Sequence, residues 1–143
     1  MGKKRIVKKT EGDGESNAKK EIPAVSKKKV TAGLLYVIAS YNNTRVLLTD
    51  KSGNALASSS SGALGFKGAK KGTPFAAAKV GEVVGDKAKN IGIKDVDVII
   101  KGVGAGRESS VRSFINKGVE LNSIKDATPV PHNGPQARKP RRV

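Results

Sequence analysis

Three glycines and one arginine form the part of this sequence whose residue types and spacing could bind phosphate. Residues 101–112 read KGVGAGRESSVR, with Gly102, Gly104, Gly106 and Arg107 in succession. Glycines allow close approach of another backbone, the N-terminus of a following helix favours an anion, and arginine binds phosphate through two hydrogen bonds. We therefore expect a phosphate contact here. The alternative is a glycine-lined turn that packs against a neighbouring element.

The spacing of these glycines argues against a nucleotide cofactor. A dinucleotide site has Gly-x-Gly-x-x-Gly after its first strand, and a P-loop ends in Gly-Lys-Ser or Gly-Lys-Thr. This chain has Gly-x-Gly-x-Gly followed by Arg-Glu-Ser. It also has no cysteine and a single histidine, His132, so neither a thiolate nor a histidine-rich metal site can form. We expect no cofactor and no metal.

The charge of the chain indicates a polyanionic partner. It carries 28 Lys and Arg against 12 Asp and Glu, a formal net charge of +16. The charge is densest in residues 1–29 and 125–143, which hold few large apolar residues and are expected to be disordered basic extensions. Residues 30–124 form the expected globular α/β domain. No apolar run approaches the ~20 residues of a membrane span, and no signal peptide is recognisable. We expect a cytoplasmic protein bound to nucleic acid, with no membrane partner.

Local patterns in the middle of the chain predict five strands and two helices. Thr73 and Pro74 have the residue types of an N-cap and a first helical position, and Gly92 is a plausible stop. The order βββαβαβ requires a mixed five-stranded sheet with helices covering its faces. The expected strands are residues 34–40, 45–50, 55–60, 96–101 and 119–124, and the expected helices are residues 75–90 and 108–117.

Two further segments are expected to contact phosphate. Lys67, Lys70 and Lys71 lie among four glycines with no acidic residue between them, and the arm from His132 to Arg142 is basic. Aromatic residues make up only 3% of the chain, too few for a platform on which bases stack. We therefore expect recognition of the phosphates, sugars and shape of a nucleic acid from these segments and the glycine loop, and not from the sheet face.

An enzyme and a generic DNA-compacting protein are the alternatives. A metal-dependent nuclease needs converging carboxylates, and only Asp95 and Asp97 have suitable spacing on one strand. No histidine near them could serve as a base, since His132 lies in the Pro-rich tail. We expect no catalysis. A compacting protein would bind duplex DNA and structured RNA alike.

Five short motifs together indicate a family. They are Asn-Asn-Thr at 42–44, Gly-Phe-Lys-Gly at 65–68, Thr-Pro-Phe-Ala-Ala at 73–77, Gly-Arg-Glu-Ser at 106–109 and Thr-Pro-x-Pro-His-Asn-Gly at 128–134. In this order and spacing, residues 30–143 closely resemble small ribosomal subunit protein 11 in its bacterial form. The usual family loop is Gly-Pro-Gly-Pro-Gly-Arg, whereas Val103 and Ala105 replace both prolines here.

The resemblance implies a ribosome-bound structural protein. Its family binds 16S ribosomal RNA on the platform of the small subunit, bridges RNA helices, helps form the cleft for the mRNA–Shine-Dalgarno duplex, and neighbours small-subunit proteins 7 and 18. The implied fold is a three-layer, ribonuclease H-like α/β fold, without nuclease chemistry. The residues expected at the RNA are Asn42, Asn43, Thr44, Lys67, Lys70, Lys71, Thr73, Gly102, Gly104, Gly106, Arg107, His132, Asn133, Gly134, Arg138, Lys139, Arg141 and Arg142.

Asn133 is also a candidate for spontaneous modification. Gly134 follows it and has no side chain, so its backbone amide can reach the Asn133 side chain and form a cyclic imide that opens to isoaspartate. Pro131 and Pro135 restrict the chain on either side. We expect the turn to be held in one shape against RNA, which would either block the reaction or drive it to completion.

Overall fold

Five strands and two helices make up the folded part of the chain. The computed structural model describes residues 30–142, and the N-terminal extension expected at residues 1–29 lies outside them. The expected order βββαβαβ is confirmed, and a short 3-10 helix, η1, was not expected. The elements are β1 (Ala32–Ala39), β2 (Thr44–Asp50), β3 (Ala55–Ser60), η1 (Gly68–Gly72), α1 (Pro74–Ile91), β4 (Asp95–Lys101), α2 (Gly106–Ile115) and β5 (Glu120–Asp126).

The strands form one mixed sheet, as the sequence predicted. Their order across the sheet is β3-β2-β1-β4-β5. Strands β1, β2 and β3 pair antiparallel through short turns, whereas β4 runs parallel to both β1 and β5. Parallel neighbours need a long crossover, and the two helices supply it.

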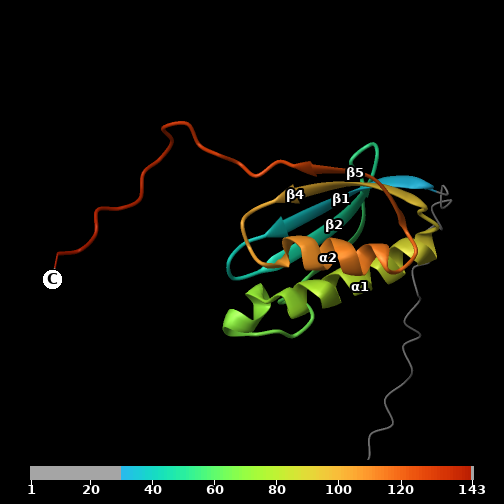
Figure 1. Ribbon diagram of the computed structural model, residues 1–143, viewed down its shortest axis with the longest axis horizontal. Helices are drawn as coiled ribbons and strands as arrows, with labels where there is room; N and C mark the ends of the chain where they lie inside the picture. The colour runs from blue at the N-terminus through green and yellow to red at the C-terminus, as the bar shows by residue number, and fades with distance from the viewer. Residues whose placement is uncertain (1–29, 143) are drawn as a thin grey trace, which may run out of the picture.

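Both helices cover the same face of the sheet, so residues 30–142 form one sheet layer and one helix layer, where three layers were expected. Leu35, Val37 and Val98 point toward the helices and are buried. The intervening residues of β1 and β4 on the other face are partly or largely exposed. The reason is topological, because the β3-to-β4 and β4-to-β5 crossovers advance in the same direction across the sheet. Right-handed crossovers that advance in one direction fall on one face (Figure 1).

The core between the sheet and the helices is aliphatic, as the composition predicted. Phe114 is its one large aromatic residue, and only 1% of it is exposed. The remaining members of the core are mostly valine, leucine, isoleucine and alanine from β1, β2, β4 and the two helices. No helix within residues 30–142 is long and apolar enough to cross a bilayer.

The ends of α1 follow their sequence signals. The Thr73 hydroxyl accepts a hydrogen bond from the backbone N–H of Ala76 at 3.3 Å, and Pro74 takes the first helical position. Gly92 ends the helix with a φ of 94°, in the left-handed region that favours glycine. Helix α2 begins at Gly106 and ends at Ile115, two residues before the expected bounds at each end.

Two glycines of α1 face α2. Gly81 lies against α2 itself, and Gly85 lies against Lys117, just after the C-terminal end of α2. A Cβ built on Gly81 would overlap the backbone carbonyl of Ser110, which cannot move without moving α2. A Cβ on Gly85 would instead meet the base of the Lys117 side chain, 2.7 Å from its Cγ and 3.0 Å from its Cβ, so a rotamer change relieves only part of this contact. The two helices can therefore approach closely only while position 81 lacks a side chain.

The substitution Gly81→Ala should destabilise the protein although alanine is the better helix former. Helix propensity favours alanine by about 1 kcal/mol, whereas overpacking against a fixed backbone costs about 1–3 kcal/mol. The comparison variant is Gly85→Ala, which should destabilise the protein less, because its nearest contacts are with a side chain and not with a backbone carbonyl. Urea unfolding of both variants measures the difference. Equal unfolding free energies for the two variants would show that α1 and α2 can move apart at Gly81 at little cost.

Candidate nucleic-acid interface

The turn between β1 and β2 is held between two glycine-containing segments. Ser40 donates a backbone hydrogen bond to the Asn43 carbonyl at 2.9 Å, which closes the turn. A Cβ on Gly72 would overlap the carbonyl oxygen of Tyr41, and a Cβ on Gly104 would overlap that of Ser40. The turn, η1 and the β4–α2 loop consequently meet at one end of the sheet (Figure 1).

The glycines of the β4–α2 loop serve this packing. Gly102 has a φ of 103°, and a Cβ there would overlap the carbonyl oxygen of Ala39. Gly104 donates its backbone N–H to the same carbonyl at 2.8 Å and is buried. Gly106 is buried against the Thr44 side chain. The geometry thus favours the glycine-lined turn that the sequence left open as the alternative to a phosphate cradle.

Arg107 is engaged inside the protein. Its Nη1 donates to the Gly102 carbonyl at 2.6 Å, and its Nη2 forms an ion pair with Asp126 at the end of β5. Thr128 completes the group, because its hydroxyl accepts from the Gly102 N–H at 3.2 Å. We call Gly102, Arg107, Asp126 and Thr128 the clasp. It fastens the base of the C-terminal arm to the glycine loop.

The carboxylate of Asp126 is stabilised as an anion by the clasp. The Thr128 hydroxyl donates to its Oδ1 at 2.6 Å and the Thr128 backbone N–H donates at 2.9 Å. These two hydrogen bonds and then Arg107 lower the pKa of Asp126 from 3.8 to about 2. Because Asp126 offsets the charge of Arg107, the guanidinium is a positioning group more than an available phosphate ligand.

The lysine segment presents its charges outward at the same end. Lys67 and Lys70 are exposed and Lys71 is half-buried, and none of the three forms an ion pair within residues 30–142. Thr73 is half-buried, and its hydroxyl donates to the Lys70 carbonyl at 2.7 Å besides capping α1. Thr73 therefore fixes the backbone of the lysine segment where it joins α1.

Two aromatic side chains beside this segment were not expected at the surface. Tyr41 is 78% exposed and Phe75 is 65% exposed. Phe75 packs edge-on against Phe66 with 6.1 Å between ring centroids, and Lys79 lies over it with Nζ 5.8 Å from the centroid. Flat apolar faces next to lysines can stack on nucleic-acid bases. Composition alone could not show that these few aromatics lie outside the core.

The Asn-Asn-Thr motif is divided between surface and core. Asn42 is exposed and Asn43 is half-buried. Thr44 begins β2 and is completely buried, and a Cβ on Gly106 would overlap its hydroxyl. The Thr44 side chain therefore packs inside the fold, and we leave Thr44 out of the candidate interface although the sequence placed it at the RNA. Its role is to seat the β4–α2 loop.

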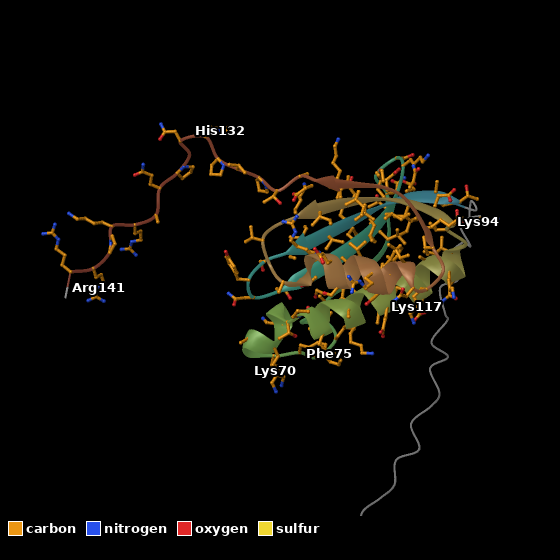
Figure 2. The ribbon with its side chains drawn as sticks, in the orientation of Figure 1. Lys70, Phe75, Lys94, Lys117, His132 and Arg141 are labelled. Carbon is orange, nitrogen blue, oxygen red and sulfur yellow. The ribbon has the colours of Figure 1, made fainter. Side chains whose placement is uncertain are left out.

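The C-terminal arm leaves the body beyond the clasp. Residues 127–142 contain no helix or strand, and all of them except Thr128 are exposed. Figure 2 shows His132 and Arg141 well away from Lys70. Asn133 is the one non-glycine residue of the described chain with a positive φ, 57°. The structure thus brings the turn, the lysine segment and the loop together, and it leaves residues 132–142 apart. That set is His132, Asn133, Gly134, Arg138, Lys139, Arg141 and Arg142.

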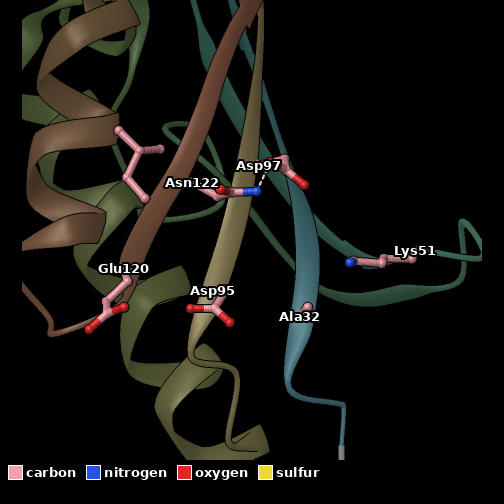
Figure 3. Close-up of a pocket in the computed structure, with 7 residues that line it drawn as sticks. Ala32, Lys51, Asp95, Asp97, Glu120 and Asn122 are labelled. Atoms are coloured by element: carbon pink, nitrogen blue, oxygen red, sulfur yellow. Dashed lines mark hydrogen bonds between the residues drawn. The ribbon is translucent and has the colours of Figure 1, made fainter.

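Acidic side chains gather at the opposite end of the sheet. Asp95, Asp97 and Glu120 line a shallow pocket of about 340 Å³ together with Lys51 (Figure 3). Asp97 accepts hydrogen bonds from Asn122 at 2.9 Å and from Ser123 at 2.6 Å, so it is already engaged by β5. Within residues 30–142 no group of three or more His, Cys, Asp or Glu residues is placed to hold a metal ion.

Only part of the clasp could be predicted from the sequence. Asp126 and Thr128 stand two residues apart, a spacing typical of local side-chain-to-backbone turns, so that half was recognisable. Arg107 lies nineteen residues earlier, and only the parallel pairing of β4 with β5 brings it to Asp126. Sequence reasoning therefore assigned Arg107 to phosphate.

Comparison with known proteins gives one consistent result. A family described as ribosomal protein S11 matches residues 33–142. Small ribosomal subunit protein uS11 of Variovorax paradoxus (strain S110) is 51% identical over 128 residues, covering 90% of this chain and 96% of the relative. The uS11 proteins of Leptothrix cholodnii and Polaromonas sp. are 49% and 51% identical over the same shares.

Titration of Asp126 should separate the contributions to the clasp. The folded pKa near 2 lies below the ordinary value of 3.8, so the clasp stabilises the fold above about pH 4 and is lost as the pH falls toward 2. Thr128→Val should raise this pKa more than Arg107→Met, because it removes the hydroxyl hydrogen bond, the largest single cause of the low pKa, while the Thr128 backbone N–H still donates. Carboxyl resonances followed by NMR measure both, with Thr128→Ser as the conservative control. A larger rise in Arg107→Met would show that the ion pair dominates.

Proposed function

The chain belongs to the ribosomal protein S11 family, and we propose that it binds 16S ribosomal RNA through the end of the sheet where the lysine segment lies. It is a structural protein of the small ribosomal subunit and not an enzyme. From the family resemblance we further propose a place on the platform, where the protein bridges RNA helices beside the mRNA–Shine-Dalgarno duplex. Small-subunit proteins 7 and 18 are its proposed neighbours, in the cytoplasm.

One observation supports this surface above others. Three lysines without carboxylate partners in the described chain lie beside two exposed aromatic faces, and the glycine contacts fix both to the rigid β1–β2 turn. Polyanion binding needs cations that are not already neutralised, and structured RNA offers both phosphates and unstacked bases. The core of the proposed interface is therefore Asn42, Lys67, Lys70, Lys71 and Phe75, with the C-terminal arm as a second contact.

The Arg107 contact expected from the sequence takes a different form in this proposal. The guanidinium holds the loop and the arm in register, and phosphate meets the surrounding cations. Val103 is 57% exposed at the tip of the loop, so its side chain faces the proposed partner where the family usually has proline. Competition between platform RNA and duplex DNA at matched salt tests the function. Equal affinity for the two would favour the DNA-compacting alternative.

Replacing Lys67, Lys70 and Lys71 by glutamine should weaken binding and flatten its salt dependence. Each phosphate contact removed should lower the log–log slope of affinity against salt by about 0.7–0.9. Filter binding with a platform fragment of 16S ribosomal RNA over a range of salt measures the slope. The triple variant Lys87→Gln, Lys89→Gln, Lys94→Gln is the control for net charge. If both triple variants gave the wild-type slope, the lysine segment would lie outside the interface.

The state of Asn133 should depend on assembly. Its positive φ and the neighbouring Pro131, whose Cβ lies 3.0 Å from a Cβ built on Gly134, support a restricted turn. We expect the isoaspartate fraction in assembled subunits to be near none or near all, and to differ from that of the unbound protein. Peptide mass spectrometry with an isoaspartate-specific label measures both. The same intermediate fraction in the two states would remove assembly as its control.

A further inference from the structure

The sheet face away from the helices is a surface that the proposed interface does not use. Both helices lie on the other side, and within residues 30–142 nothing covers this face. Ile38, near the C-terminal end of β1, is 46% exposed, although β1 is the middle strand of the sheet. An exposed apolar side chain on the middle strand makes this face a candidate contact surface.

The strand register arranges the side chains of this face in rows. One row crosses the sheet as Ser60, Arg45, Ile38 and Lys101, because Arg45 pairs with Ser60 and Ile38, and Ile38 pairs with Lys101. The next row is Ser58, Leu47, Tyr36, Ile99 and Lys125. We call these two rows the open-face rows. They lie toward the end of the sheet that bears the β1–β2 turn.

The open-face rows carry three cations and no carboxylate. Arg45 and Lys125 are exposed and Lys101 is half-buried, and none of the three forms an ion pair within residues 30–142. The acidic residues of this face lie in the following rows: first Asp97, which accepts a hydrogen bond from Ser123, and then Asp95 with Glu120. The cations carried by the strands of this face therefore lie in the half that adjoins the lysine segment and the clasp, whereas Lys51 at the other end lies among carboxylates.

We propose that the open-face rows are a second binding surface for the ribose-phosphate backbone of ribosomal RNA. The charge complementarity selects a polyanion over an apolar protein partner. Tyr36 is half-buried between its row neighbours Leu47 and Ile99, so its ring is not presented for base stacking, and the contact is to phosphate. The inference rests on the proposed function and extends it from one end of the sheet to its uncovered face.

The first test removes the three charges and keeps the stems. The variant Arg45→Gln, Lys101→Gln, Lys125→Gln should lower the log–log salt slope for platform RNA by about 2, at 0.7–0.9 for each phosphate. The charge-matched control Lys87→Gln, Lys89→Gln, Lys94→Gln should keep the wild-type slope. Matching thermal midpoints establish that both variants fold.

The lysine-segment variant in parallel separates the two proposals. If it lowers the slope while the open-face variant does not, the open face is not an RNA surface and the proposed function stands. If wild type shows no preference for platform RNA over duplex DNA, the proposed function itself fails.

The second test identifies the occupant in assembled small subunits. The natural chain has no cysteine, so Ser58→Cys provides a single attachment point in the open-face rows for an iron chelate that cleaves nearby backbones. Asn90→Cys, exposed on α1, is the matched control on the helical side. RNA cleavage that is stronger from position 58 than from position 90 supports the inference. Cleavage of a neighbouring polypeptide from position 58, without RNA cleavage, overturns it in favour of a protein partner.

Discussion

The β1–β2 turn can pack against its neighbours because Gly72, Gly102 and Gly104 have no side chains there. Three carbonyl oxygens of one turn occupy the space that Cβ atoms would fill, so η1 and the β4–α2 loop are fixed relative to the sheet by backbone contacts. Backbone contacts of this kind cannot relax by a rotamer change, unlike contacts between flexible side chains. The position of every cation at this end of the molecule depends on that fit.

The clasp passes the same rigidity to the arm. Arg107 stands in the first turn of α2, Asp126 ends an edge strand, and Thr128 begins the arm. An arm that begins at a fixed point loses less conformational freedom when it binds than one tethered to a mobile loop. Arg107 is thereby lost as a possible phosphate ligand. In return, its contacts fix the direction in which the arm, with its several cations, leaves the body.

Local sequence signals predicted the helices and strands well. Prediction failed for contacts between residues that are far apart in the sequence. Thr73, Pro74 and Gly92 act through their own neighbours, so the bounds of α1 were within reach of a sequence argument. The βββαβαβ order likewise followed from short patterns. The number of layers depends on the direction in which both crossovers advance, which requires the strand order. The partner of Arg107 and the burial of Thr44 required the register of strands far apart in the chain. The exposure of Tyr41 and Phe75 also escaped, since composition counts aromatics without locating them.

The acidic pocket of Asp95, Asp97 and Glu120 lies at the end of the sheet opposite the lysine segment, and this separation of charge affects how the protein approaches a polyanion. Three carboxylates at one end of the sheet and the lysine segment at the other separate charge along the strands, so the described residues have an electric dipole in that direction. In the field of a polyanion such a dipole experiences a torque that turns the acidic end away before contact is made. Orientation during diffusion raises the rate of productive encounters, and the effect diminishes as salt shortens the Debye length. Residues outside the proposed interface would in this way influence the orientation in which the protein meets RNA.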